Sequence, residues 1–143
     1  MLSTVILLVD DEVPFVEAME RRLAKRGLDV KTAFSGEEAL QRLKELKNID
    51  VIILDVKMPG MDGLETLKQI KKAHPIVEVI MLTGHATVES AIDGMRLGAS
   101  DYLMKPCRIE VLVEKVMEAV EKKRRHEEKI VDARVREIAS RRG

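Results

Sequence analysis

Val51-Ile52-Ile53-Leu54-Asp55 is a run of four apolar residues that ends in a carboxylate. A second run, Val5–Val9, ends in Asp10 and Asp11. Short continuous apolar runs are typical of strands that are buried on both faces of a parallel sheet. A carboxylate that directly follows such a strand lies on the rim of the sheet. Two adjacent strands would therefore gather three carboxylates in one small acidic pocket.

Such a pocket has an energetic cost. Two unit charges about 4 Å apart interact with roughly 4 kcal/mol at an effective dielectric constant near 20. A fold accepts this repulsion most readily when a divalent cation or a proton relieves it. Hard oxygen ligands are those that Mg2+ prefers. The pattern therefore predicts a functional Mg2+ site formed by Asp10, Asp11 and Asp55.

Strand-like runs alternate with helical patterns along the rest of the chain. The three further strand-like runs are residues 28–33, Val77–Leu82 and Asp101–Met104. Between them, apolar residues recur at intervals of three or four. The alternation predicts an α/β fold of the flavodoxin-like (βα)5 type, a doubly wound five-stranded parallel sheet in the order 2-1-3-4-5. Ligands bind such sheets where the strand order reverses, between the strands that end in Asp10-Asp11 and in Asp55.

Composition excludes several classes of protein. The chain has 143 residues, enough for one domain with a full core, and its 25 basic and 25 acidic residues balance. Neither this overall balance nor the net charge of the end of the chain, from Glu121 onward, suggests nucleic acid as the main partner. Cys107 is the single cysteine, and no signal peptide or long apolar span is recognisable. These features predict a cytoplasmic protein without a membrane partner.

The methionines are also expected to have mainly structural roles. Methionine usually fills gaps in a core, and six of the eight are expected at core or turn positions. These six are Met58, Met61, Met81, Met95, Met104 and Met117.

The segments that follow the predicted strands resemble the receiver domains of two-component response regulators. The matching segments are Leu8–Glu12, Asp55–Gly63, Leu82–Gly84 and Gly98–Pro106. They occur in the family's order and at its spacing over about residues 4–120. Each segment alone is a weak signal, and together they are highly specific. The resemblance implies a switch that is controlled by phosphorylation.

The family's roles carry over position by position. Asp55 looks like the phosphoacceptor, a carboxylate nucleophile that attacks a phosphoryl group. The resemblance implies that Asp11, Asp55 and the backbone carbonyl of Lys57 bind Mg2+ directly, with Asp10 acting largely through bound water. Lys105 would pair with a phosphoryl oxygen. The implied phosphodonor is a histidine kinase or a phosphotransfer protein.

Two further residues are implied in switching. Thr83 would turn its hydroxyl toward the phosphoryl group, and Tyr102 would change rotamer with it. The change would reach a face formed by the helix around Val88–Met95, the strand Asp101–Met104 and the helix that begins near Ile109. The resemblance implies that this face is the output surface, used for dimerisation or for binding a target.

Two positions near the predicted pocket vary within the family. Lys57 lies two residues after Asp55, and His85 lies two residues after Thr83. Our hypothesis is that both side chains tune the rate of dephosphorylation. Surface residues without such a role are the simpler interpretation.

Each functional interpretation has a simpler counterpart. Asp10 and Asp11 could cap a helix, Asp55 could be a turn residue, and Lys105 could be a solvated charge. These readings do not predict four strand ends that meet at one edge. A phosphatase of the haloacid-dehalogenase type would need an acid at the position of Lys57. A receiver-fold binding module that acts without phosphorylation is the remaining alternative, because no GxGxxG segment supports a dinucleotide site. Chemistry on its own Asp55 would not make this chain an enzyme in the usual sense.

The end of the chain differs from the rest. Glu121–Lys129 contains no apolar side chain, and an apolar stripe then returns at Val131, Val135 and Ile138. We expect a receiver domain over residues 1–120 and a charged helical extension over residues 121–143. The charged stretch interrupts the heptads, so a solvated helix and a homodimer seam both remain open.

The segment Gly84–Val88 resembles receivers of the nitrogen-regulation type, in which such a helix leads to an ATPase output domain. No GxxxxGK[ST] loop and no helix-turn-helix follow in this sequence. A stand-alone receiver and a fragment of a longer regulator both remain open.

Overall fold

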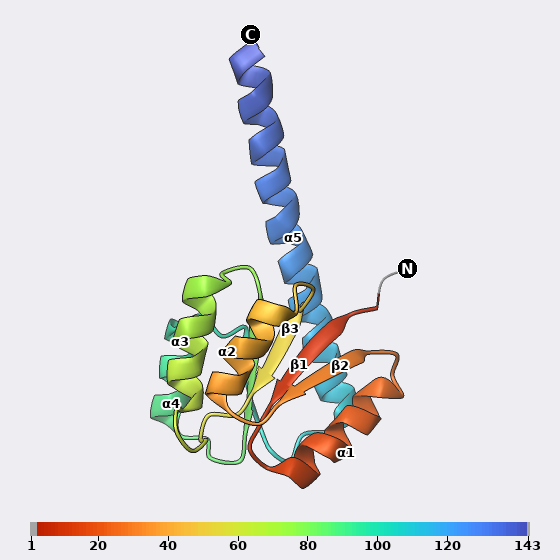
Figure 1. Ribbon diagram of the computed structural model, residues 1–143, viewed down its shortest axis with the longest axis vertical. Helices are drawn as coiled ribbons and strands as arrows, with labels where there is room; N and C mark the ends of the chain where they lie inside the picture. Colours follow the sequence, from red (N-terminus) through yellow and green to blue (C-terminus); the bar gives the residue numbers. More distant parts are fainter. Residues whose placement is uncertain (1–2, 143) are drawn as a thin grey trace.

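Strands and helices alternate strictly in the computed structural model, which describes residues 3–142 (Figure 1). The strands are β1 (Val5–Val9), β2 (Asp29–Ala33), β3 (Val51–Leu54), β4 (Glu78–Thr83) and β5 (Asp101–Met104). The helices are α1 (Val13–Ala24), α2 (Gly36–Glu45), α3 (Gly63–Ala73), α4 (Val88–Arg96) and α5 (Ile109–Arg142). All strands are parallel, in the order β2-β1-β3-β4-β5, so the predicted fold is confirmed.

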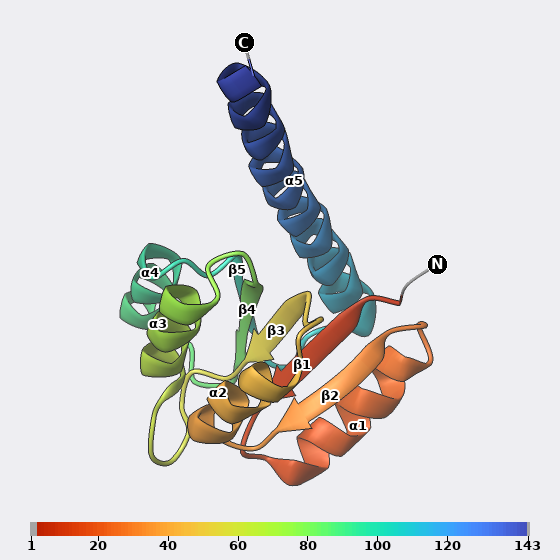
Figure 2. The same cartoon turned by 45° about the horizontal axis from the view of Figure 1, so that its top comes forward.

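Helices cover both faces of the sheet (Figure 2). Successive side chains of β1 point to opposite faces, as the pleat of a strand requires. Leu7 and Val9 pack in the layer with α2 and α3, whereas Ile6 and Leu8 pack in the layer with α1 and α5. These four side chains are at most 1% exposed, and burial of each contributes about 1.5–3 kcal/mol.

The register of the sheet positions the strand ends. Val9 of β1 pairs with Leu54 of β3, so Asp10 and Asp55 follow neighbouring strands at the same level. On the other side of β3, Thr83 at the end of β4 pairs with Met104, which directly precedes Lys105. All the strand ends singled out from the sequence therefore lie at the carboxyl edge of the sheet, the lower edge in Figure 1.

The expected burial of three methionines is wrong. Met95, Met104 and Met117 are 49%, 64% and 44% exposed. Helix α4 lies beside the edge strand β5, and its only buried residue is Gly94. Helical spacing indicates an apolar stripe on the helix, but it does not show whether the stripe is buried. A helix at the edge of a sheet buries little of such a stripe. Met58 and Met81 are buried as predicted.

Helix α5 continues without a break to Arg142 and projects beyond the amino ends of the strands (Figures 1 and 2). The predicted extension of the last helix is thus confirmed. Every residue from Arg124 to Arg141 is exposed. The division at residue 120 stays a prediction, and Met1, Leu2 and Gly143 lie outside the described residues. Among residues 3–142, none of the helices has the length and apolar character needed to cross a membrane.

Candidate functional site

The three predicted carboxylates meet at the carboxyl edge. Asp10, Asp11 and Asp55 each offer one oxygen, and these oxygens lie within 4.8 Å of one another. Asp10 and Asp55 are buried, and Asp11 is the more exposed of the three. The fold therefore holds two carboxylates away from water and places the third at the opening of the pocket.

Asp55 has an incompletely bonded carboxylate. Its side chain is 1% exposed, and its Oδ2 lies 3.9 Å from Nζ of Lys105. Its Oδ1 is buried and has no hydrogen-bond partner among the described residues. An unsatisfied buried acceptor costs about 1–3 kcal/mol, so this oxygen lowers the stability of the folded protein. A buried oxygen of this kind is a candidate for binding a ligand or for chemistry.

Lys105 is the cation of the site. Its Nζ lies 2.6 Å from Oδ2 of Asp10, 3.5 Å from Oε1 of Glu12 and 4.0 Å from the centre of the Phe15 ring. Burial disfavours the charged ammonium, but the hydrogen bond to Asp10 and the charges of Asp10, Asp55 and Glu12 outweigh it and raise the pKa of Lys105. Lys105 therefore carries its positive charge at neutral pH.

The surroundings of Asp10 disfavour its charged form, whereas those of Lys105 favour the charged form. Burial is the largest cause and raises the pKa of Asp10, and the charge of Asp55 adds to this effect. The hydrogen bonds from Lys105 and from the backbone N–H of Glu12 oppose the shift without cancelling it. A further cation in this pocket would relieve the same repulsion.

Gly63 allows the loop after β3 to approach the backbone of Asp55 closely. The Gly63 N–H donates to the carbonyl of Val56 at 2.6 Å. A Cβ atom at Gly63 would lie 2.0 Å from the carbonyl oxygen of Asp55, so a side chain here would displace the backbone of Asp55. Asp62 caps α3 by accepting the N–H of Glu65 at 2.9 Å. The close approach of Gly63 was not predicted, although Asp62-Gly63 is part of a matching segment.

The hydroxyl groups of the two predicted switch residues, Thr83 and Tyr102, contact different partners. Thr83 is fully buried, and its hydroxyl accepts the backbone N–H of His85 at 3.0 Å. Tyr102 is half-buried, and its hydroxyl lies 2.6 Å from Oγ of Ser90. Within residues 3–142 no hydrogen bond joins Thr83 to Tyr102. The contact with Ser90 was not predicted, because spacing in the sequence does not reveal contacts between a helix and a strand.

Lys57 and His85 are exposed and line two hollows beside the pocket. One hollow, of about 400 Å³, also contains Asp11 and Glu12. The other, of about 430 Å³, extends to Asp62 and to the beginning of α4. Both residues therefore lie beside the acidic pocket, on the side of Asp11, the most exposed of its three carboxylates.

The fold and the site define this protein as a receiver. The chain belongs to the family described as the response regulator receiver domain, whose model matches residues 6–117. Phosphorylation on an aspartate is the general function of this family, and its members generally bind Mg2+. The family that the sequence resembled is therefore confirmed.

Curated proteins of similar sequence support this membership. The chain is 41% identical over 116 residues to the DNA-binding transcriptional regulator NtrC of Escherichia coli strain K12, a match that covers 81% of this chain and 24% of NtrC. The chain thus spans about a quarter of the length of the curated relatives it matches.

Two solved receiver domains match over nearly their whole length. A response regulator receiver domain from Clostridium thermocellum has a TM-score of 0.81 and 38% identity, covering 85% of this chain and 97% of that one. The receiver domain of NtrX from Brucella abortus has a TM-score of 0.76 and 35% identity, covering 81% and 98%.

Proposed function

We propose that Asp55 accepts a phosphoryl group from a histidine kinase or a phosphotransfer protein in a Mg2+-dependent reaction. The buried, unpartnered oxygen of Asp55 is the observation that carries this proposal. One carboxylate oxygen of Asp55 attacks phosphorus while the bond between phosphorus and the donor atom breaks. The donor atom keeps the electron pair of that bond, and Asp55 becomes an acyl phosphate.

The neighbouring residues have separate tasks in this proposal. Lys105 is already charged and sits beside Asp55, so it can pair with a phosphoryl oxygen without a rearrangement of charge. The carboxylate set fits Mg2+ because hard oxygen donors converge within 4.8 Å. Asp11, Asp55 and the Lys57 carbonyl would hold the ion directly, with Asp10 acting through water. When bound, the ion would neutralise negative charge on the phosphoryl group.

The output face is proposed to be the surface of α4, β5 and α5. Val88, Ile92 and Met95 on α4 are 78%, 46% and 49% exposed, and Met104 on β5 is 64% exposed. Apolar surface gathered in this way favours a protein contact. We propose that phosphorylation acts through Thr83 and Tyr102 on this face, which then binds a target or a second copy of the chain.

We propose a second dimer surface on the projecting part of α5. Val131, Val135 and Ile138 are 58%, 59% and 54% exposed and lie at i, i+4 and i+7 on one side of the helix. A homodimer through this stripe is therefore part of the proposal. Analytical ultracentrifugation of the chain measures this dimerisation, which the Val135→Lys variant should weaken.

We also propose a cytoplasmic location without direct contact with nucleic acid or membranes, and no enzymatic activity beyond the chemistry on Asp55 itself. The balanced charge and the lone cysteine support the location. The DNA binding stated in the name of NtrC belongs to that protein, of which this chain spans 24%.

Intact mass measurement tests the proposed function. The full chain is incubated with acetyl phosphate and Mg2+, beside an Asp55→Asn variant and a metal-free sample. The expected result is a single phosphate-sized gain that both controls lack. If a known receiver is labelled in parallel and this chain gains no mass and binds no beryllofluoride, the phosphoacceptor proposal fails. Binding without phosphorylation would then be the better description.

Lys57 and His85 are proposed to set the lifetime of the phosphoryl group, because both line hollows that also contain Asp11 or Val56, the neighbour of Asp55. We expect the variant Lys57→Ala/His85→Ala to change the decay rate of the phosphorylated protein, followed by intact mass. A decay rate equal to that of the wild-type chain would remove this hypothesis.

A further inference from the structure

Ser90 connects the beginning of α4 to the only tyrosine of the chain. We infer that Ser90 is a positioning residue of the switch, whose hydroxyl ties the rotamer of Tyr102 to the loop that follows Thr83. This inference rests on the proposed phosphorylation of Asp55 and names the residue through which that event would reach Tyr102.

The Ser90 hydroxyl is shared between two sets of partners. Its Oγ lies 2.6 Å from the Tyr102 hydroxyl and 3.0 Å from both the backbone nitrogen and Oγ1 of Thr87. The Thr87 carbonyl oxygen is 3.1 Å away. A serine hydroxyl donates one hydrogen bond and accepts two, so it cannot satisfy four partners at once. It can accept from Tyr102 and from the Thr87 N–H while it donates to one of the two Thr87 oxygens, so the bond to Tyr102 and the bonds that cap α4 meet at one hydroxyl.

The loop between β4 and α4 is held at both ends by hydroxyl groups. At its start, Thr83 accepts the backbone N–H of His85 at 3.0 Å. At its end, Ser90 and Thr87 form a reciprocal capping box. If Thr83 turns toward a phosphoryl group, His85 loses its acceptor and the loop must rearrange. Because the loop is only residues 84–87, the rearrangement reaches Thr87, and through Ser90 it reaches Tyr102.

The ring of Tyr102 also rests on α4. A Cβ atom built at Gly94 would lie 3.5 Å from Cδ2 of Tyr102, so the ring lies close beside this part of the helix. Ser90 and Gly94 are four residues apart and share one side of α4. Helix α4 thus approaches Tyr102 at its hydroxyl and at its ring, and the bond to the hydroxyl comes from Ser90, a residue of the capping box.

A role of Ser90 in capping alone is the competing explanation, and Thr87 offers the matched control. Replacement of Thr87 by alanine removes the side-chain acceptor for the Ser90 N–H but leaves the Ser90 hydroxyl, Tyr102 and the Thr87 backbone in place. Replacement of Ser90 by alanine removes both the capping contact and the bond to Tyr102. Ser90→Thr restores a hydroxyl.

The composition of the chain makes Tyr102 directly observable. The chain contains one tyrosine and no tryptophan, so 3-fluorotyrosine labelling gives a single 19F resonance from residue 102. The full-length wild type, Ser90→Ala, Ser90→Thr and Thr87→Ala are compared with and without beryllofluoride and Mg2+. We expect the displacement of the resonance to fall about fivefold in Ser90→Ala, the equilibrium change expected for the loss of one hydrogen bond. Ser90→Thr and Thr87→Ala should keep most of the wild-type response.

Intact mass with acetyl phosphate is recorded for each variant, so that phosphorylation is read separately. A Ser90→Ala chain that gains phosphate but has a weak Tyr102 response supports the inference. A full response in Ser90→Ala, an equal loss in Thr87→Ala, or a Ser90→Thr chain that behaves like Ser90→Ala overturns it. A wild-type chain that gains phosphate while its Tyr102 resonance stays fixed overturns the inference alone. A wild-type chain without a mass gain overturns the proposed function as well.

Discussion

The carboxyl edge and the amino edge of the sheet each contain a buried carboxylate beside a lysine, but the two carboxylates differ in their hydrogen bonding. At the carboxyl edge, Asp55 is buried with one oxygen that finds no partner among residues 3–142, and Lys105 is shared among several carboxylates. At the amino edge, Glu78 is equally buried but accepts the Ser100 hydroxyl and lies 3.7 Å from Nζ of Lys122. One edge leaves hydrogen-bonding capacity free, and the other uses it.

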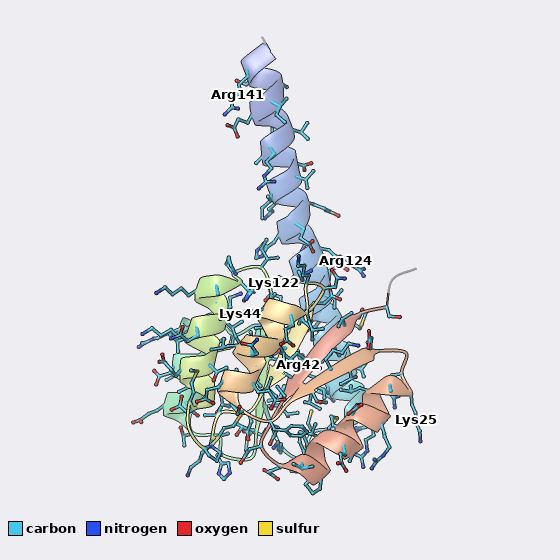
Figure 3. The ribbon with its side chains drawn as sticks, in the orientation of Figure 1. Lys25, Arg42, Lys44, Lys122, Arg124 and Arg141 are labelled. Carbon is cyan, nitrogen blue, oxygen red and sulfur yellow. The ribbon has the colours of Figure 1, made fainter. Side chains whose placement is uncertain are left out.

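The bonds at the amino edge come largely from the stretch of α5 that lacks apolar residues. Besides Lys122, His126 lies 3.9 Å from Oε1 of Glu78. Lys123 lies 3.2 Å from Oδ1 of Asp50, whose Oδ2 accepts the backbone N–H of Val5 at 2.9 Å. Figure 3 shows Lys122 at the base of the projecting helix. The charged stretch therefore fastens the helix to the sheet.

This comparison teaches that burial of a carboxylate does not by itself mark a functional site. Glu78 and Asp55 are 1% and 2% exposed, so exposure does not distinguish them. What distinguishes Asp55 is the unsatisfied oxygen together with two neighbouring acids, an arrangement that costs stability and favours a cation.

The largest expected effect is on phosphorylation and separates the two lysines. Lys105→Ala should slow labelling of Asp55 by acetyl phosphate about 100-fold, the usual cost of losing one electrostatic partner of a reacting group. Lys122→Ala also removes a lysine beside a buried carboxylate, yet it should leave the rate within about twofold, since it lies at the other edge. Time courses of intact mass measure both. Equal losses in the two variants would contradict the assignment of chemistry to the carboxyl edge.

The second expected effect is on stability and has opposite signs at the two edges. Asp55→Asn should raise the free energy of unfolding by about 1 kcal/mol in Mg2+-free buffer, because it removes repulsion with Asp10. Glu78→Gln should lower it by about 1–2 kcal/mol, because a charged acceptor is lost beside Lys122 and Ser100. Urea unfolding compares the two amide variants, which change charge with little change of shape. Shifts of the same sign would refute the comparison.

The sequence predicted the parts of this molecule that depend on local pattern. Apolar runs ending in Asp10-Asp11 and in Asp55 predicted two strands and the acidic pocket, because a parallel sheet aligns the carboxyl ends of its strands. The alternation of strand and helix patterns predicted the fold and the strand order. Helical spacing and charge pairs predicted the long last helix.

Contacts between distant residues could not be predicted in this way. Phe15 and Glu12 contact Lys105, about 90 residues later, and no periodicity encodes such a pair. The stretch Glu121–Lys129 has the composition of a solvated helix, yet its Lys122 pairs with Glu78 and its Lys123 pairs with Asp50. A signal existed in Glu78, an acid at the beginning of an otherwise apolar strand, because a buried acid requires partners.

The third effect is a pH dependence confined to the carboxyl edge. Burial, with the charge of Asp55, raises the pKa of Asp10 above its ordinary value of 3.8. The folded protein thus holds this proton more tightly than the unfolded chain does. The resulting stabilisation is fully present below the ordinary pKa and is lost as the pH rises through the folded-state pKa.

Comparison with Asp10→Asn isolates this contribution. Without Mg2+, the wild-type chain should lose stability relative to the variant as the pH rises from about 4 toward neutrality, and added Mg2+ should reduce the loss. Urea unfolding at a series of pH values measures the difference between the two profiles. Parallel profiles in the absence of Mg2+ would show that Asp10 is not held in the way described.

The smallest effect concerns the direction of the projecting helix. Glu78→Gln removes the charge that faces Lys122 and His126, so the part of α5 beyond residue 121 should sample a wider range of directions. Nitroxide labels on Glu37→Cys and Ser140→Cys in a Cys107→Ser background report this range by electron–electron double resonance, with unlabelled protein added to suppress distances between chains. The distance distribution should broaden in Glu78→Gln and stay unchanged in Asp55→Asn. A width that is the same in both variants would mean that the contacts of Glu78 with Lys122 and His126 do not orient the helix. Its direction would then be set by the pair of Lys123 with Asp50 and by apolar packing that includes Val116 and Val120.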